Sequence, residues 1–328
     1  MKHKVLKLLK ETTNSFISGQ IICEKLGVSR TAVWKAINLL KKDGYEIASE
    51  PRNGYKLIIS PDILTHEEIS TYLQTNFIGN KIIYFDTVNS TNNKAKELAF
   101  IGEPEGTVVI AEEQTTGRGR LGRQFVSPKY KGIWMSLVLR PKVDPMYISR
   151  ITLIGAAAVN LAISDIGIKT YIKWPNDIVL QNKKVSGILT EMSAELNQTN
   201  YVIMGIGINV NIKEDEFPED LKDKATSLIT VTGKKILRKE LVALVLNHFE
   251  ILYDEFIQNA TIKTAIEICK KNSIFIGKEI RVIKRGISVN AIALDINDIG
   301  ELVVKYEDGT IDNIISGEVS ARGLYKYI

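Results

Sequence analysis

The pattern of hydrophobic and polar positions divides the chain into three stretches. In residues 1–60, apolar side chains recur at helical spacing three times and then alternate. From about 63 to 272, apolar strands alternate with amphipathic or wholly apolar helices, and from 273 onward short alternating strands are separated by turns. The pattern predicts a multidomain α+β protein with boundaries at 1–62, 63–272 and 273–328.

The first stretch has the helix caps and helix-ending glycines expected of a helix-turn-helix. Helices are predicted over residues 4–12 and 20–26, and a third helix follows a tight turn. The residues expected to cap or stop these helices are Ser18, Gly27, Ser29 and Gly44. The apolar side chains expected to face inward are Ile21, Ile22, Leu26, Val33, Ile37 and Leu40. Residues 45–58 read as a hairpin around Arg52-Asn53-Gly54, so the stretch predicts a winged helix.

The charge of the chain is concentrated in this first stretch. Residues 1–60 carry eleven Lys or Arg and five Asp or Glu, a net charge of +6, while the whole chain carries +5. The outer face of the third helix and the wing tip offer donors for phosphates and base edges: Ser29, Arg30, Thr31, Trp34, Lys35, Asn38 and Arg52. These features favour DNA binding over the alternative, a helical interaction or dimerisation module with a basic face.

The middle stretch reads as an α/β domain. Strands are predicted at 81–88, 106–114, 132–141 and 201–212, with a strand-turn-strand over 170–192. Helices are predicted at 89–100, 148–167, 235–259 and 261–272. The last stretch, with turns at 297–300 and 308–309, predicts a small β-barrel or sandwich.

Composition narrows the class of protein. With 45% hydrophobic and 25% charged residues, the chain resembles an ordinary globular protein. We expect no apolar run near the roughly 18 residues of a membrane span, and hence no membrane partner. The two cysteines, Cys23 and Cys269, exclude a disulfide framework, so we expect reduced thiols and a cytoplasmic location.

The stretch "GRGRLG" (117–122) matches the dinucleotide fingerprint letter for letter, but its surroundings do not. That fingerprint requires a helix that starts inside it, whereas here a β-rich run follows. Glycine instead allows close approach of a ligand to the backbone, and arginine supplies a permanent charged fork for phosphate or carboxylate. The loop therefore predicts an anionic small-molecule site, with a basic RNA-binding or solvated loop as the alternative.

Four further polar clusters are candidates for the same pocket: "NSTNN" (89–93), "KWPND" (173–177), "KKVSG" (183–187) and "GIGINVN" (205–211). The three histidines lie outside them, and neither a Ser-His-Asp arrangement nor Cys or His spacing for a metal is present. A site rich in Arg and Lys without such a nucleophile suits chemistry on phosphates by positioning and electrostatics.

In this order, "STN", "QTTGRGRLGR", "KWPNDI", "KVSGIL.E" and "GIGINVN" resemble the biotin–protein ligase family. With the winged helix, the chain resembles the bifunctional bacterial type, a biotin–[acetyl-CoA-carboxylase] ligase that is also a biotin operon repressor. The resemblance implies a central domain of the biotin/lipoate ligase type, with a mixed sheet and flanking helices, and an SH3-like C-terminal barrel. It implies that biotin and ATP, with Mg²⁺, give biotinyl-5′-AMP, from which biotin passes to a lysine of the biotin carboxyl carrier protein.

The resemblance also implies residue roles. Biotin would be bound by Ser90, Thr91, Asn92, Gln114, Arg118, Gly119, Arg120, Lys184 and Gly187. ATP or adenylate would be bound by Arg118, Arg120, Arg123, Phe125, Lys173, Lys184 and Asn209. Catalysis would involve Lys184, Arg120 and Asp177, and Glu318 and Arg322 would approach the nucleotide. Biotinyl-5′-AMP would act as corepressor by promoting a homodimer that reads a palindromic operator. The chain departs from the family at Phe125, where the family often has Trp.

Three alternatives share these features. A lipoate ligase-like acyl-adenylating enzyme would have a related pocket. A ligand-sensing transcription factor would lack ligase activity, although the phosphate-binding cations Arg120, Arg123 and Lys184 count against it. A ligase could also retain the winged helix without binding DNA.

Overall fold

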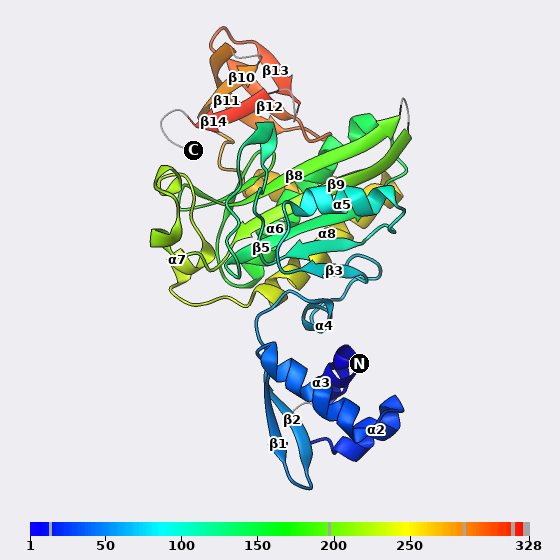
Figure 1. Ribbon diagram of the computed structural model, residues 1–328. Coiled ribbons are helices and arrows are strands. Elements are labelled where there is room, and N and C mark those ends of the chain that lie inside the picture. Colours follow the sequence, from blue (N-terminus) through cyan, green and yellow to red (C-terminus); the bar gives the residue numbers. More distant parts are fainter. Residues whose placement is uncertain (13–14, 196–197, 285–286, 316–318, 324–328) are drawn as a thin grey trace. The chain divides into compact units, whose positions relative to one another are not determined.

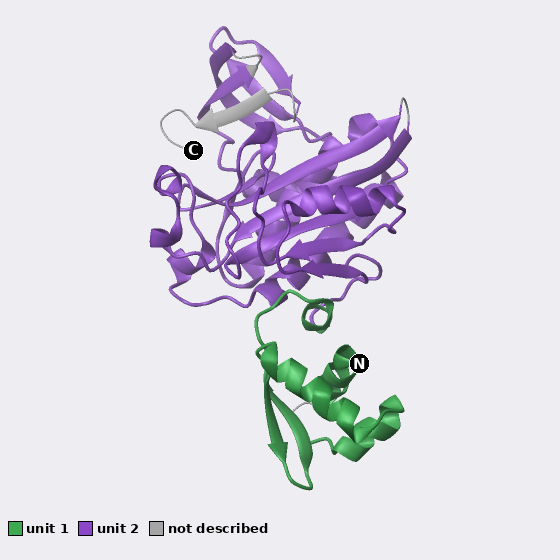
Figure 2. Cartoon of the chain, viewed as in Figure 1, with its two compact units in different colours: residues 1–71 green, residues 72–328 purple. Residues whose placement is uncertain are grey.

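The computed structural model describes residues 1–12, 15–195, 198–284, 287–315 and 319–323. The chain forms two compact units, residues 1–71 and residues 72–328 (Figure 2). The domain boundaries expected at 62/63 and 272/273 stay predictions.

The first unit is built from short helices and one hairpin. Its elements are α1 (Lys2–Glu11), α2 (Gly19–Leu26), α3 (Arg30–Lys42), β1 (Glu46–Glu50), β2 (Gly54–Ile59) and α4 (His66–Ile69). The Ser18 hydroxyl accepts a hydrogen bond from Ile21 N at 3.1 Å, and that of Ser29 accepts one from Ala32 N at 3.2 Å. Both N-caps are therefore confirmed, and Gly27, in the left-handed region at φ 63°, ends α2 as expected.

The inward faces are confirmed with one exception. Val33, Ile37 and Leu40 are buried in one core with Ile22. The prediction for Ile21 is wrong, since its side chain is 44% exposed. An eight-residue helix contacts its core along a single stripe, which Ile22 occupies, and the preceding residue lies about 100° away around the axis.

The second unit is organised on a seven-stranded mixed sheet (Figure 1). Its strands, in spatial order, are β3 (Ile82–Phe85), β4 (Val108–Ala111), β5 (Gly132–Leu139), β9 (Gln198–Asn209), β8 (Lys183–Glu195), β7 (Asp177–Leu180) and β6 (Tyr171–Lys173). The β3–β4 pair is parallel and the other pairs are antiparallel, which confirms the expected mixed sheet.

Helices cover both faces of this sheet (Figure 1). The helix α5 (Thr91–Phe100) lies in front of it, and α6 (Ser149–Asp165) and α8 (Arg238–Asn259) lie behind it with α9 (Lys263–Lys271). Every residue of β5 is buried, as expected for a central strand covered on both sides. The short helix α7 (Leu228–Thr232) and the 3₁₀ turns at Arg120–Gly122, Pro145–Tyr147, Glu214–Glu216 and Glu219–Leu221 complete this part.

The α6 segment corrects one expectation. An 18-residue window within residues 145–165 has a mean hydropathy of 1.5, and the segment is long and apolar enough to cross a membrane by length and composition, so the expectation that no apolar run approaches that length is wrong. However, 72% of this window is buried within the unit, where α6 packs on α8, α9 and β8. Its apolar character therefore fits a central core helix.

The C-terminal part is a five-stranded antiparallel sheet with the order β13-β12-β11-β10-β14. The strands are β10 (Glu279–Lys284), β11 (Ile287–Ile296), β12 (Leu302–Tyr306), β13 (Ile311–Ile314) and β14 (Val319–Gly323). Its β11–β12 turn contacts the turn between β6 and β7, because Trp174 Nε1 donates to Gly300 O at 3.1 Å. The small all-β domain predicted from the sequence is confirmed.

Candidate active site

The first part of the site is the N-terminus of α5, where three small polar residues are buried. Ser90 caps the helix, and Thr91 and Asn92 occupy its first two positions at 3% and 6% exposure. Ser136 Oγ, from β5, donates to Asn92 Oδ1 at 2.6 Å and lies 2.8 Å from Thr91 Oγ1. Hydrogen bonds thus hold these neutral polar groups in one orientation before any ligand arrives.

Gln114 extends this polar group from the end of β4. Its Oε1 accepts from Thr91 N at 2.8 Å and from Thr91 Oγ1 at 3.0 Å, while its Nε2 donates to Ser127 Oγ at 2.9 Å. The partners on each side fix which end of the amide is oxygen and which is nitrogen.

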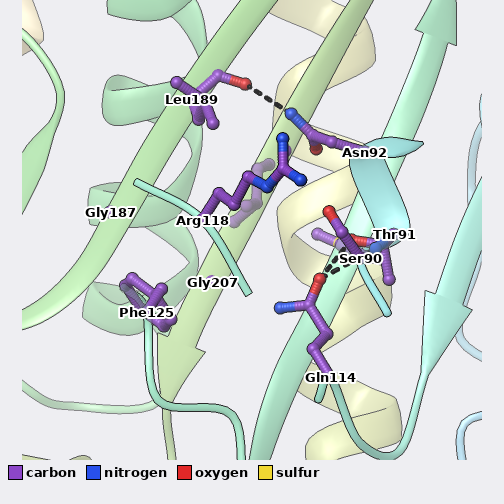
Figure 3. Close-up of a pocket in the computed structure, with 12 residues that line it drawn as sticks. Ser90, Thr91, Asn92, Gln114, Arg118, Phe125, Gly187, Leu189 and Gly207 are labelled. Carbon is purple, nitrogen blue, oxygen red and sulfur yellow. Dashed lines mark hydrogen bonds between the residues drawn. The ribbon is translucent and has the colours of Figure 1, made fainter. Parts of the chain in front are cut away.

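These residues line a pocket that is narrowed by two side chains of the Gly/Arg loop, residues 117–125 (Figure 3). Its lining residues are Ser90, Thr91, Asn92, Gln114, Arg118, Phe125, Met135, Gly187, Leu189, Gly205, Ile206 and Gly207. Figure 3 shows the Arg118 guanidinium beside Asn92, and Phe125 near Gly207. The remaining cavity is about 30 Å³, roughly a tenth of the smallest typical ligand pocket. A ligand therefore requires Arg118, Phe125 or both to move.

The Gly/Arg loop is a compact turn between two antiparallel strands. Gly119 N donates to Arg123 O at 2.7 Å, and Phe125 N donates to Gly117 O at 2.9 Å. A Cβ on Gly117 would lie 2.4 Å from Phe125 O, so this position requires glycine. Between β4 and β5, where every residue is described, the helical structure is limited to a three-residue 3₁₀ turn, and the two strands are antiparallel. The segment is therefore not a dinucleotide-binding βαβ unit.

A charged cluster lies next to the pocket. Lys184 Nζ is 2.5 Å from Asp177 Oδ1 and 5.7 Å from the centroid of the Phe125 ring. Arg120 Nη1 donates to Asn176 Oδ1 at 3.0 Å, and Asn176 Nδ2 donates to Asp177 Oδ1 at 3.2 Å. Burial lowers the pKa of Arg120, although Asp177 opposes that change. The cluster therefore brings two cations, held by one carboxylate and one amide, to the side of a neutral polar pocket.

Glycine makes room for these side chains on β8 and β9. A Cβ on Gly187 would lie 2.6 Å from Lys184 Nζ, and one on Gly207 would lie 2.7 Å from the Phe125 ring. Because glycine has no Cβ, the Lys184 and Phe125 side chains can lie directly against the backbone of the two strands.

Three further predicted residues, Asn209, Lys173 and Arg322, are not among those that line the pocket. Asn209 Nδ2 donates to Thr226 O at 3.0 Å, so this amide ties β9 to the segment before α7. Lys173 is buried on β6 in register with Asp177, and Arg322 lies on β14. Glu318 lies outside the described residues.

The sequence prediction assigned no role to Ser136 or Glu191. Glu191 stands inside the motif KVSGIL.E, whereas no local signal marks Ser136, which reaches Asn92 only through the fold.

The candidate DNA-binding side chains lie on the outer face of the first unit. Those of Ser29, Arg30, Thr31, Trp34, Lys35 and Arg52 are exposed and that of Asn38 is half-buried. Arg30 and Arg52 border a hollow of about 670 Å³ between the N-termini of α2 and α3 and the wing.

Comparison with known proteins gives three matching family models. They are the biotin/lipoate A/B protein ligase family at residues 84–209, a helix-turn-helix domain at 2–56, and the biotin protein ligase C-terminal domain at 275–322. The bifunctional ligase/repressor BirA of Bacillus spizizenii is 42% identical over 97% of this chain and 98% of its own length. The protein of the same description from Escherichia coli is 28% identical over 98% of each chain.

The solved structures agree on the fold. The biotin protein ligase from Aquifex aeolicus in complex with biotin and ATP is 33% identical, with a TM-score of 0.66 over 75% of this chain and 100% of that one. The three family models, in their order along the chain, and the near full-length relatives lead to one conclusion. The chain belongs to the family of bifunctional biotin protein ligases and repressors.

Proposed function

We propose that the chain attaches biotin to a lysine of a biotin carboxyl carrier protein in two steps. A carboxylate oxygen of biotin attacks the α-phosphorus of ATP, which forms biotinyl-5′-AMP and releases pyrophosphate. The lysine amine of the carrier then attacks the acyl carbon, forms the amide and releases AMP. The relatives are described as ligases, and the Aquifex aeolicus enzyme was solved with biotin and ATP, which supports this assignment.

The arrangement that carries the proposal is a neutral polar pocket flanked by fixed cations. The hydroxyls and amides of Ser90, Thr91, Asn92 and Gln114 suit the uncharged ureido end of biotin, which has two N–H donors and one carbonyl acceptor. The Lys184 and Arg120 side chains suit the negative charge that gathers where carboxylate and α-phosphate meet. In this proposal Lys184 stabilises that charge directly.

The Gly/Arg loop would close the site after the substrates enter. Arg118 and Phe125 border the space that a ligand needs, so one or both are expected to turn outward and then pack against biotin and the adenylate. Gly119 and Arg123 belong to the same turn and would move with them. Phe125, in place of the common Trp, offers a flat apolar surface without the indole N–H.

Mg²⁺ fits this site as a companion of ATP. Among the described residues, no group of three or more His, Cys, Asp or Glu could hold a metal ion alone. Mg²⁺ commonly binds through substrate phosphates and one or two carboxylates, and Asp177 is the carboxylate beside the cations. Bound there, the ion would neutralise phosphate charge.

Exchange of ³²P-labelled pyrophosphate into ATP tests the first step and the choice of acid. The proposal expects exchange that depends on biotin and stops when EDTA removes Mg²⁺. Exchange supported by lipoate but not by biotin would favour the lipoate ligase-like alternative. Biotin binding without any exchange would favour the sensor without ligase activity.

We propose further that the first unit binds operator DNA and that biotinyl-5′-AMP promotes the homodimer that does so. The net charge of +6 over residues 1–60 and the exposed donors of α3 and the wing support DNA binding. The substitution Arg52→Ala should weaken binding and reduce the salt slope by about 1. The dimer is tested by sedimentation with and without biotinyl-5′-AMP, and unchanged mass and DNA affinity would contradict it.

The cytoplasmic location also stays a proposal, supported by two free cysteines.

A further inference from the structure

Glu191 lies outside the pocket but holds one of its polar residues. Its Oε2 accepts from Asn92 Nδ2 at 2.7 Å, and its Oε1 accepts from Lys96 Nζ at 2.6 Å. Asn92 and Lys96 are one helical turn apart on α5, whereas Glu191 comes from β8, so one carboxylate bridges a helix and a strand.

This contact decides which way the Asn92 amide points. A carboxylate only accepts hydrogen bonds, and so does Leu189 O, which lies 3.4 Å from the same nitrogen. The nitrogen is therefore held on the side of Glu191, and the oxygen is directed to the pocket, where Ser136 donates to it. Figure 3 shows the Asn92 nitrogen turned to Leu189 on the far side from Ser90.

We infer that Glu191 is a positioning residue for biotin, which sets the Asn92 amide to accept rather than donate. The inference rests on the proposed function, because the ureido ring of biotin supplies N–H donors and a site built to pair with them discriminates strongly. Lys96 holds the second oxygen of Glu191 and so fixes the carboxylate. Without Glu191, the amide is free to turn and present its own N–H to the ligand N–H.

The first test is Glu191→Ala in the full chain, assayed by pyrophosphate exchange. KM for biotin should rise about tenfold, the effect of losing one charge-assisted hydrogen bond. KM for ATP and kcat should stay within about twofold of the wild type, because Glu191 touches neither the charged cluster nor the reacting atoms. Desthiobiotin, which keeps the ureido ring, should show the same relative rise.

A rescue separates positioning from a general structural role. In Glu191→Gln one oxygen must serve two donors, Asn92 Nδ2 and Lys96 Nζ, so KM for biotin should rise there as well. Adding Lys96→Met removes the competing donor, and the double variant should recover most of the affinity for biotin. Both Gln variants keep the size of the side chain, so they remain informative if the Ala variant fails to fold.

Three outcomes are distinguishable. A wild-type chain without biotin-dependent exchange would refute the proposed function itself. An active wild type whose Glu191→Ala variant binds biotin within twofold would overturn the positioning role. An equal rise of KM for biotin and ATP, without rescue by the double variant, would overturn it too, in favour of a packing role.

Discussion

Replacing Gly205 by alanine tests the geometry of the pocket most sharply. A Cβ at this position would lie 2.1 Å from Asn92 Oδ1, and ordinary contact begins near 3.4 Å, so one of the two must retreat by about 1.3 Å. The strand has little freedom to move, because Gly205 is paired with Ser136 on β5 and with Leu189 on β8. The amide must therefore turn, and it loses its short bonds to Ser136 and Glu191.

The size of the effect follows from those bonds. A hydrogen bond to a charged group contributes about 1.5–3 kcal/mol, so losing the Glu191 contact predicts roughly 10- to 100-fold weaker biotin binding. A loss of about 2 kcal/mol from a unit of this size would lower its Tm by about 4–8 °C. Isothermal titration with biotin measures the first quantity and scanning calorimetry the second.

A second glycine provides the matched control. A Cβ on Gly155 would lie 2.7 Å from Met204 Sδ, also a forced contact, but with a flexible apolar side chain that has no part in the pocket. The Gly155→Ala variant changes Tm through repacking alone, and its biotin affinity should stay within about twofold of the wild type. Biotin affinity within twofold of the wild type in Gly205→Ala would refute the account of Asn92.

Three further outcomes are expected. Lys184→Met should lower kcat for pyrophosphate exchange about 10²- to 10³-fold. Lys183→Met should stay near wild type, because Lys183 Nζ donates to Lys222 O and pairs with Glu214, both outside the pocket lining, and equal losses would contradict the charge-stabilising role. Trp174→Phe removes the bond to Gly300 O and should cost about 1–3 kcal/mol of stability, so an unchanged Tm by calorimetry would contradict that contact. Burial raises the pKa of the Cys269 thiol to about 12, so it stays protonated at pH 8, and intact mass after iodoacetamide should show labelling of native protein at Cys23 alone.

The sequence predicted best where structure is set by neighbours along the chain. The Ser18 and Ser29 caps and the Gly27 stop depend on residues within three or four positions along the chain, so they could be predicted directly. Short elements without such local signals were missed. The five residues of α7 are rich in β-branched and apolar side chains and show no helical period, so only their tertiary surroundings make them a helix.

In the site, the sequence predicted candidate residues but not the hydrogen bonds between residues that are distant in the chain. The Gly/Arg loop and the polar start of α5 could be identified because residue types carry their chemistry. The link between Asn92 and Glu191 spans 99 positions, and that between Asn92 and Ser136 spans 44, so neither has a local signal. Asn209 illustrates the opposite case, since its motif suggested a ligand contact and the fold gives its amide a backbone partner.

The most direct test of the central claim is the intact mass of a biotin carboxyl carrier domain after incubation with the chain, ATP, Mg²⁺ and biotin. We expect the carrier to gain the mass of one biotinyl group with the wild-type chain, and the gain to be lost or greatly slowed with Lys184→Met. A carrier that stays unmodified, although the chain binds biotin, would contradict it.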